Sequence, residues 1–163
     1  SIVLIQNDGK SRVVTIQKDA IDFVEFVDPR QILAASGQTL HIADAETATV
    51  TRTLELPNSI TARPSVGAFI YVPVGGQIVK IYKSNFTILE WLLPADSALV
   101  RSIAASEKQV FISRDSDGMV LDSKGAIEWR SAHARRSSFI AISNSSVFFV
   151  GDSGDLSVFS LQQ

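Results

Sequence analysis

The feature that most constrains how this chain can fold is a strand–turn–strand pattern that recurs at a nearly fixed spacing. Its clearest copy is Gly118–Trp129, in which an apolar run, a polar turn with glycine and a second run ending on tryptophan follow one another. Strands that follow comparable glycine turns begin near Thr39, Gln77, Met119 and Asp155, at spacings of 38, 42 and 36 residues. A repeat of about 40 residues predicts a chain built from similar small units stacked side by side.

The units are predicted to be small antiparallel sheets, because short apolar runs alternate with clusters of Gly, Asp, Asn, Ser and Pro. Four short strands in a period of about 40 residues are typical of a β-propeller blade. We therefore predict an all-β fold of antiparallel four-stranded blades, as a β-propeller or partial propeller of about four to five blades. Residues 1–163 form one domain in this prediction, with repeat groups at about 1–19, 20–57, 58–94, 95–131 and 132–163.

Some positions carry more specific predictions. The first group is predicted to be a hairpin that turns at Asn7–Lys10, and Ile60–Arg63 to be a weak first strand of the third group. His41 is expected at the surface of a sheet. Because one blade cannot bury both of its faces alone, the core between blades is expected to hold Phe69, Phe111, Phe148 and Phe149.

The best copy of the repeat has glycine, a strand with Leu-Asp, a turn with glycine, and a strand ending in tryptophan. These positions are Gly118, Leu121, Asp122, Gly125 and Trp129. The pattern resembles the repeat of the quinoprotein-like β-propeller family, with the WD-repeat family as near kin. Looser matches are Gly76, Ile78, Ile81 and Trp91, then Gly154, Leu156 and Phe159, then Leu40, Ile42 and Asp44.

The resemblance implies a propeller scaffold and not the chemistry of quinoprotein dehydrogenases. Those enzymes hold their cofactor with a larger body, calcium ligands and often vicinal cysteines, whereas this chain has no cysteine and about half the blades. No cofactor is expected. Because the count of blades is low, the chain is predicted to be a piece of a larger propeller, an open arc, or an arc completed by another chain. Uncovered blade faces would favour self-association.

Composition excludes several classes of function. The net charge of −2 gives no general basic field for nucleic acid or an anionic membrane. The absence of cysteine excludes disulfides, zinc–thiolate sites and thiol catalysis. No apolar run approaches the ~20 residues of a membrane span, so direct insertion is not expected. The compartment is left open, although Asn85-Phe86-Thr87 and Asn144-Ser145-Ser146 would accept N-glycans in a secretory lumen.

The densest basic run, residues 130–136, is predicted to lie in a connection between two groups. Arg130, His133, Arg135 and Arg136 are therefore the candidate partner-binding residues. Arginines in such a loop could pair with an anionic peptide or a phosphate. The alternative is a solvated linker. Nucleic-acid binding would need aromatic side chains interleaved with the charges, and none is adjacent.

Two other constellations are interpreted as turns. Gly151–Asp155 resembles the nucleophile motif of trypsin-like proteases, but only 20 residues separate His133 from Ser153 and the family's cysteines are missing. Asp115–Gly118 has carboxylates at alternate positions, as a calcium loop does, but lacks the later bidentate acid. We therefore predict no catalytic residue and no metal site.

Together these observations predict a non-catalytic β-propeller scaffold that mediates protein–protein interaction within a larger assembly. The predicted partners are proteins, including another chain that completes the propeller. The alternative is an extracytoplasmic module that binds a ligand or a glycan. A degenerate hydrolase or quinoprotein is the third hypothesis.

Overall fold

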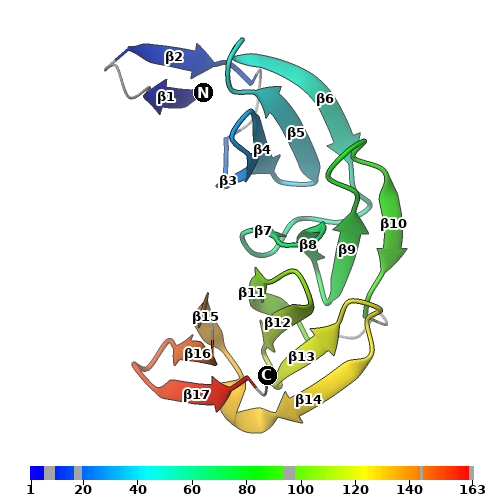
Figure 1. The fold of residues 1–163 in the computed structure, drawn as a ribbon, viewed down its shortest axis with the longest axis vertical. Helices are drawn as coiled ribbons and strands as arrows, with labels where there is room; N and C mark the ends of the chain where they lie inside the picture. The colour runs from blue at the N-terminus through cyan, green and yellow to red at the C-terminus, as the bar shows by residue number, and fades with distance from the viewer. Residues whose placement is uncertain (6–9, 17–19, 94–97, 144, 162–163) are drawn as a thin grey trace.

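The computed structural model describes residues 1–5, 10–16, 20–93, 98–143 and 145–161, which form five antiparallel sheets (Figure 1). The N-terminal hairpin comprises β1 (Ile2–Ile5) and β2 (Ser11–Val14). Blade 1 comprises β3 (Phe23–Asp28), β4 (Gln31–Ser36), β5 (Thr39–Asp44) and β6 (Thr49–Glu55). Blade 2 comprises β7 (Ser65–Val66), β8 (Ile70–Val74), β9 (Gln77–Ile81) and β10 (Ile88–Trp91).

Blade 3 comprises β11 (Val100–Ala105), β12 (Gln109–Arg114), β13 (Gly118–Asp122) and β14 (Ile127–Ser131). A single 3-10 turn, η1 (Ala132–Ala134), leads into blade 4. Blade 4 has three described strands, β15 (Ser137–Ile142), β16 (Ser146–Gly151) and β17 (Leu156–Ser160). The predicted all-β fold of antiparallel four-stranded blades is confirmed. The predicted turn at residues 7–10 lies almost wholly outside the described residues.

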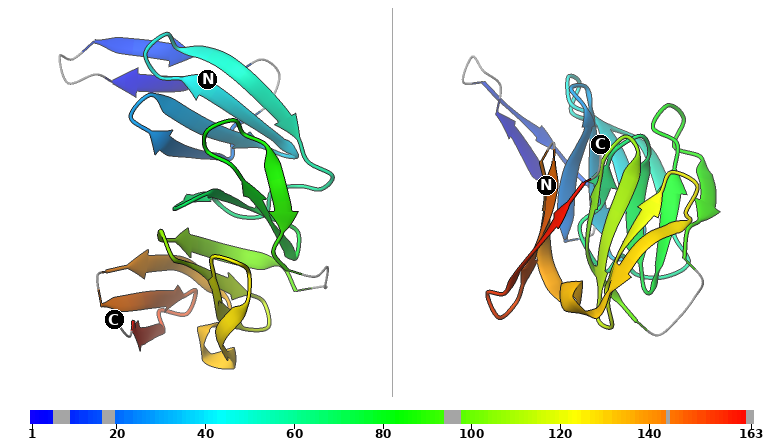
Figure 2. Two further views of the ribbon diagram at one scale, coloured as in Figure 1. Left: turned by 45° about the vertical axis from the view of Figure 1, so that its right-hand side comes forward. Right: turned by 60° about the horizontal axis from the view of Figure 1, so that its bottom comes forward.

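The blades stack in an open arc (Figures 1 and 2). Strands within each blade pair in chain order. The first strands, β3, β7, β11 and β15, line the inner side of the arc, and β6, β10 and β14 lie on its outside. Each connection between blades therefore runs from an outer strand to the next inner strand. The N-terminal hairpin and blade 4 occupy opposite ends of the arc, and these ends do not meet in Figure 1.

The cores lie between neighbouring sheets, as stacking requires. One apolar cluster joins blades 1 and 2, a second joins blades 2 and 3, and a third joins blades 3 and 4. The predictions for Phe111 and Phe149 are confirmed, since both are buried in the third cluster. Phe69 packs at the edge of the second cluster. Trp129 contacts Phe149 and Phe159, with ring centroids 6.2 and 4.0 Å away, so the tryptophan that ends the repeat copy packs between blades 3 and 4.

The structure corrects three local predictions. Phe148 is only partly buried, because it lies on the face of blade 4 that has no further blade against it. The first strand of blade 2 is Ser65–Val66 and not residues 60–63; Ile60 makes an isolated bridge to Val74 instead. His41 is buried and not at the surface, because it shares its sheet face with Ala43, which packs under the N-terminal hairpin.

Gly118 lies where the connection between blades 3 and 4 approaches a strand most closely. A Cβ atom at this position would lie 2.3 Å from the Cβ of Ala134 and 2.8 Å from its carbonyl oxygen. Only glycine fits without moving the backbone of the linker. The glycine that opens the best repeat copy therefore allows close packing of the linker.

We expect Gly118→Ala to lower the free energy of unfolding by about 1–3 kcal/mol, because the added methyl group overpacks the contact with Ala134. Urea denaturation followed by tryptophan fluorescence measures the change. Gly151→Ala is the matched control, since its Cβ would meet Asp155 at an ordinary 3.5 Å. An equal loss in both variants would contradict this explanation.

No helix among the described residues has the length and apolar character needed to cross a membrane. Of the two sequons, the one at Asn85 lies in the exposed connection between β9 and β10. Asn144 lies outside the described residues.

Candidate functional site

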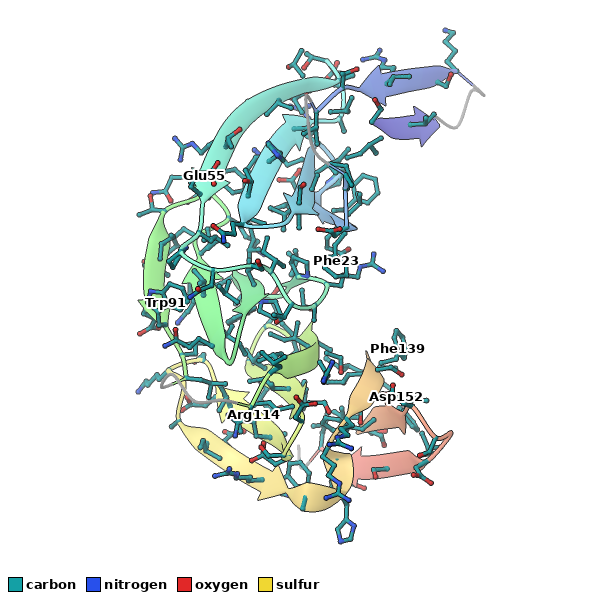
Figure 3. The ribbon with its side chains drawn as sticks, turned by 180° about the vertical axis from the view of Figure 1, so that it is seen from behind. Phe23, Glu55, Trp91, Arg114, Phe139 and Asp152 are labelled. Atoms are coloured by element: carbon teal, nitrogen blue, oxygen red, sulfur yellow. The ribbon has the colours of Figure 1, made fainter. Side chains whose placement is uncertain are left out.

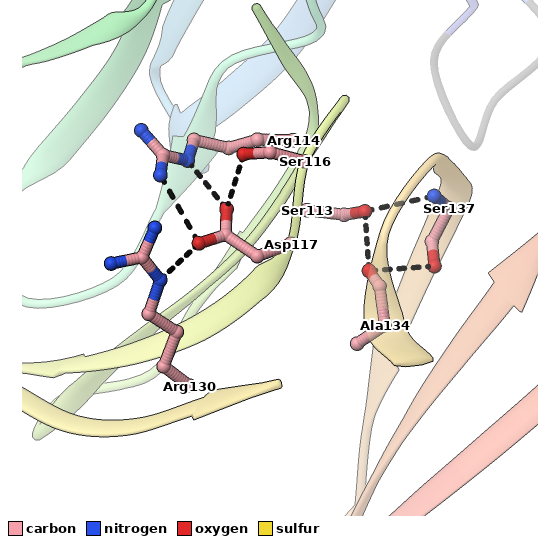
Figure 4. A network of polar contacts seen from close by, with 7 residues as sticks. All are labelled: Ser113, Arg114, Ser116, Asp117, Arg130, Ala134 and Ser137. Atoms are coloured by element: carbon pink, nitrogen blue, oxygen red, sulfur yellow. Dashed lines mark hydrogen bonds and ion pairs between the residues drawn. The ribbon is translucent and has the colours of Figure 1, made fainter. Parts of the chain in front are cut away.

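The linker between blades 3 and 4 is held rigidly against blade 3. The Ser131 hydroxyl accepts a hydrogen bond from the His133 amide at 3.2 Å and starts the 3-10 turn. The Ala134 carbonyl accepts the Ser113 hydroxyl at 2.7 Å, and the Ser113 hydroxyl in turn accepts the Ser137 amide at 2.8 Å (Figure 4). The Arg136 amide donates to the Arg114 carbonyl at 2.8 Å. These bonds fix where the linker's side chains emerge.

The turn between β16 and β17 lies opposite this linker. The Gly151 amide donates to the Asp155 carbonyl at 2.8 Å, and Gly154 closes the turn with a φ of +87°. The predicted polar turn at residues 151–155 is therefore formed. Figure 3 shows Asp152, which belongs to this turn, on blade 4 at one end of the arc.

A groove of about 640 Å³ lies between the linker and the turn. Phe149 and Ser137 contribute to its lining from blade 4. The linker and the turn supply its charged groups and part of its polar lining, with His133, Arg135, Arg136, Asp152, Ser153 and Asp155. The structure thus brings three of the four predicted binding residues into one site. It also adds Asp152 and Asp155, which sequence reasoning assigned only to a turn.

The two arginines of the groove are available for a ligand. Among the described residues, nothing forms a hydrogen bond or ion pair with the side chains of Arg135 and Arg136, and both side chains are exposed. The charge of Arg136 contributes to lowering the pKa of Asp115, although the hydrogen bond from Arg101 to Asp115, at 2.7 Å, is the larger cause. The groove therefore combines free guanidinium groups with a fixed pattern of neighbouring charges.

Arg130, the fourth predicted residue, is placed differently. Its guanidinium pairs with Asp117, which also binds Arg114 through Nε and Oδ1 at 2.8 Å (Figure 4). Arg114 and Asp117 are only 4% and 6% exposed. Burial raises the pKa of Asp117, but the hydrogen bonds from Arg114 and Arg130 outweigh it and hold the pKa below its usual value. Arg130 thus closes a structural ion-pair network beside blade 3.

His133 and Ser153 both line the groove without forming a catalytic pair. The Ser153 hydroxyl donates to the Asp155 carboxylate. Among the described residues, nothing hydrogen-bonds the imidazole of His133 to that hydroxyl. An activated serine requires such a bond to a base. The part of the chain that the structure describes also holds no group of three or more His, Cys, Asp or Glu arranged for a metal ion.

Comparisons with known proteins bear on the fold. No protein-family model matches the sequence, and neither does any curated protein. The computationally designed protein Ika4 is similar in structure, with a TM-score of 0.78 and 15% identity over 93% of this chain and 96% of its own. The Neurospora crassa Pan2 WD40 domain has a TM-score of 0.75 and 15% identity over 98% of this chain and 56% of its own.

BamB from Moraxella catarrhalis has a TM-score of 0.75 and 16% identity over 94% of this chain and 50% of its own. The chain therefore spans about half the length of these two natural propellers. At such identities the similarity concerns the fold, and it confirms the resemblance to quinoprotein-like and WD-repeat propellers. The chain has a β-propeller repeat fold.

Proposed function

We propose that this chain is a non-catalytic β-propeller scaffold within a larger assembly, and that it binds a protein partner in the groove between residues 132–136 and 151–155. The partner segment is extended and carries an acidic side chain. That side chain pairs with Arg135 and Arg136, and a basic or amide group of the same segment faces Asp152 and Asp155.

One observation carries this proposal. The consecutive residues Arg135 and Arg136 both line a groove of about 640 Å³, and their side chains have no hydrogen-bond or ion-pair partner among the described residues. Arginine is suited to this task because its planar donors bind a carboxylate bidentately. The linker that carries these arginines is fixed by the Ser113 and Ser137 hydrogen bonds. Its backbone therefore loses little conformational entropy on binding.

The non-catalytic part of the proposal is supported by the position of the Ser153 hydroxyl, which donates to Asp155 and not to a histidine. The glycan-binding alternative is not favoured. A sugar platform needs an open aromatic face, whereas Phe149, the aromatic residue in the lining of the groove, is only 1% exposed.

The test is selection of random peptides displayed on phage against the immobilised chain. We expect acidic peptides to be enriched and their affinity to fall at least about tenfold in Arg135→Ala/Arg136→Ala, since a charge-assisted bond is lost at each site. Lys108→Ala/Lys124→Ala is the matched control, because it removes the same charge from exposed positions outside the groove.

The control should bind the selected peptides as the unaltered chain does. Equal weakening in both double variants would show that net charge alone attracts the peptides, and the groove would then not be the site. Selection of peptides without acidic residues would likewise contradict the proposed role of the arginines.

A further inference from the structure

The charged groups around the groove extend beyond its lining, onto the inner strand of blade 3. The pairing of β11 with β12 shifts in register between Val100 and Ser102, so Arg101 is the extra residue of a β-bulge. A bulge redirects the side chain that it carries. Here the Arg101 Nε donates a hydrogen bond to Asp115 Oδ1 at 2.7 Å, and the arginine side chain is 50% exposed. Arg101 is thus held in place and still open to solvent.

The fold brings Arg101 close to Arg136 of the groove. The Ser102 hydroxyl donates to the Ser137 carbonyl at 2.6 Å in the interior, so the residues that precede these two serines, Arg101 and Arg136, lie near one another. The Arg136 amide also donates at 2.8 Å to the carbonyl of the residue before Asp115. Asp115 therefore lies close to two arginines, one that it binds directly and one whose backbone is fixed to its neighbour.

The electrostatics agree with this arrangement. The hydrogen bond from Arg101 holds the pKa of Asp115 below its usual value, and the charges of Arg101 and Arg136 add to that effect. In turn, Asp115 raises the pKa of Arg101, first by the hydrogen bond and then by its charge, and the charge of Asp152 adds a smaller contribution. Arg136 and Asp152 line the groove from the linker and from the turn. The Arg101–Asp115 pair is therefore within electrostatic range of both.

Arg101 keeps donors that this chain does not use. A guanidinium has five N–H donors, and only the one on Nε is bound to Asp115. Among the described residues, nothing forms a hydrogen bond with the two terminal nitrogens of Arg101. Asp115 balances one positive charge, whereas Arg101 and Arg136 supply two. This place can therefore accept a further anion.

We propose that Arg101 is a third partner-binding arginine, which extends the groove onto blade 3, and that the partner segment carries two acidic side chains. This inference rests on the proposed function. One acidic side chain pairs with Arg135 and Arg136, and the other accepts hydrogen bonds from the terminal nitrogens of Arg101. The Arg101 Nε keeps its bond to Asp115, so a side chain already ordered in the free chain makes the contact. Such preorganisation lowers the entropic cost of binding.

An ordinary surface ion pair is the alternative, and the chain contains one for comparison. Arg63 Nε lies 2.9 Å from Glu25 Oε2, and the arginine side chain is 64% exposed. Glu25 belongs to blade 1 and Arg63 to the connection that enters blade 2, and neither lines the groove. Arg63→Ala and Arg101→Ala therefore remove the same charge and the same kind of ion pair. Only the second removes a residue beside the groove.

The test measures affinity by isothermal titration calorimetry, with the most enriched acidic peptide from the phage selection as the probe. Arg101→Ala should bind this peptide about tenfold more weakly, because a charge-assisted contact is lost. Arg63→Ala should bind it as the unaltered chain does. Each acidic residue of the peptide is then replaced by glutamine in turn. One of these peptides should bind Arg101→Ala and the unaltered chain equally, since it lacks the group that meets Arg101. Circular dichroism should show that both variants fold.

The outcomes separate this inference from the proposed function. Arg101→Ala that binds the peptide as tightly as Arg63→Ala would overturn the inference. So would a selection dominated by peptides with one acidic residue, or a set in which every glutamine version still loses affinity in Arg101→Ala. In these cases the proposed function stands as long as Arg135→Ala/Arg136→Ala weakens binding. If that double variant binds the peptide normally, the groove is not the site, and the proposed function fails together with this inference.

Discussion

Replacing Asp117 by alanine should lower the free energy of unfolding by about 3–5 kcal/mol, because it removes one partner of the buried ion pair between Asp117 and Arg114. The side chains of Arg114 and Asp117 are only 4% and 6% exposed, so water does not reach the position of the removed carboxylate. Arg130, the exposed member of the network, can turn to solvent and adds little to the loss. Urea denaturation of the two proteins at neutral pH measures the difference.

A matched acidic variant separates burial from ion pairing. Asp115 pairs with Arg101 at 2.7 Å, but these side chains are 29% and 50% exposed. Asp115→Ala should therefore cost only about 0–1 kcal/mol. If Asp115→Ala and Asp117→Ala cost the same, burial of the network would not be the reason for its effect.

The Asp117 carboxylate should also make the free energy of unfolding depend on pH in the acidic range. The pKa of Asp117 is lower in the folded protein than its ordinary value, so folding favours the ionised form. Its stabilising effect is complete above the unfolded pKa of about 4. It is lost progressively as pH falls from there through the lower folded pKa. Asp117→Asn should show a flatter decline over that range, and an unchanged decline would refute this assignment.

How much of this fold the sequence predicts depends on how local each determinant is. The turn after Asp122 is set by neighbours, since its carboxylate accepts the amides of Lys124 and Ala126 at 2.8 Å each. Such turns repeat at a fixed spacing, so the blades could be predicted from the chain alone. The burial of His41 could not, because it follows from the hairpin that covers that face of blade 1.

The candidate site divides in the same way. The basic linker was visible as a run of charge, but its opposing carboxylates, Asp152 and Asp155, lie on a turn of another hairpin. Nothing in local sequence pairs that turn with the linker. Arg130 belongs to the same run and yet turns toward Asp117, because it lies on β14 and not in the linker. Strand pairing therefore decides which members of the run reach the groove.

Phe111→Ala should cost about 3–5 kcal/mol of unfolding free energy, because it empties a fully buried site between blades 3 and 4. Phe148 is its counterpart in the next blade: it lies between Ala141 and Val158, as Phe111 lies between Ala104 and Val120. The two phenylalanines therefore differ in what covers them and not in their sheets. Phe148→Ala should cost much less, because Phe148 is only partly buried and no further blade covers its face of blade 4 in this structure.

Urea denaturation followed by tryptophan fluorescence measures both variants. Equal losses in Phe111→Ala and Phe148→Ala would contradict burial between blades 3 and 4 as the reason for the difference.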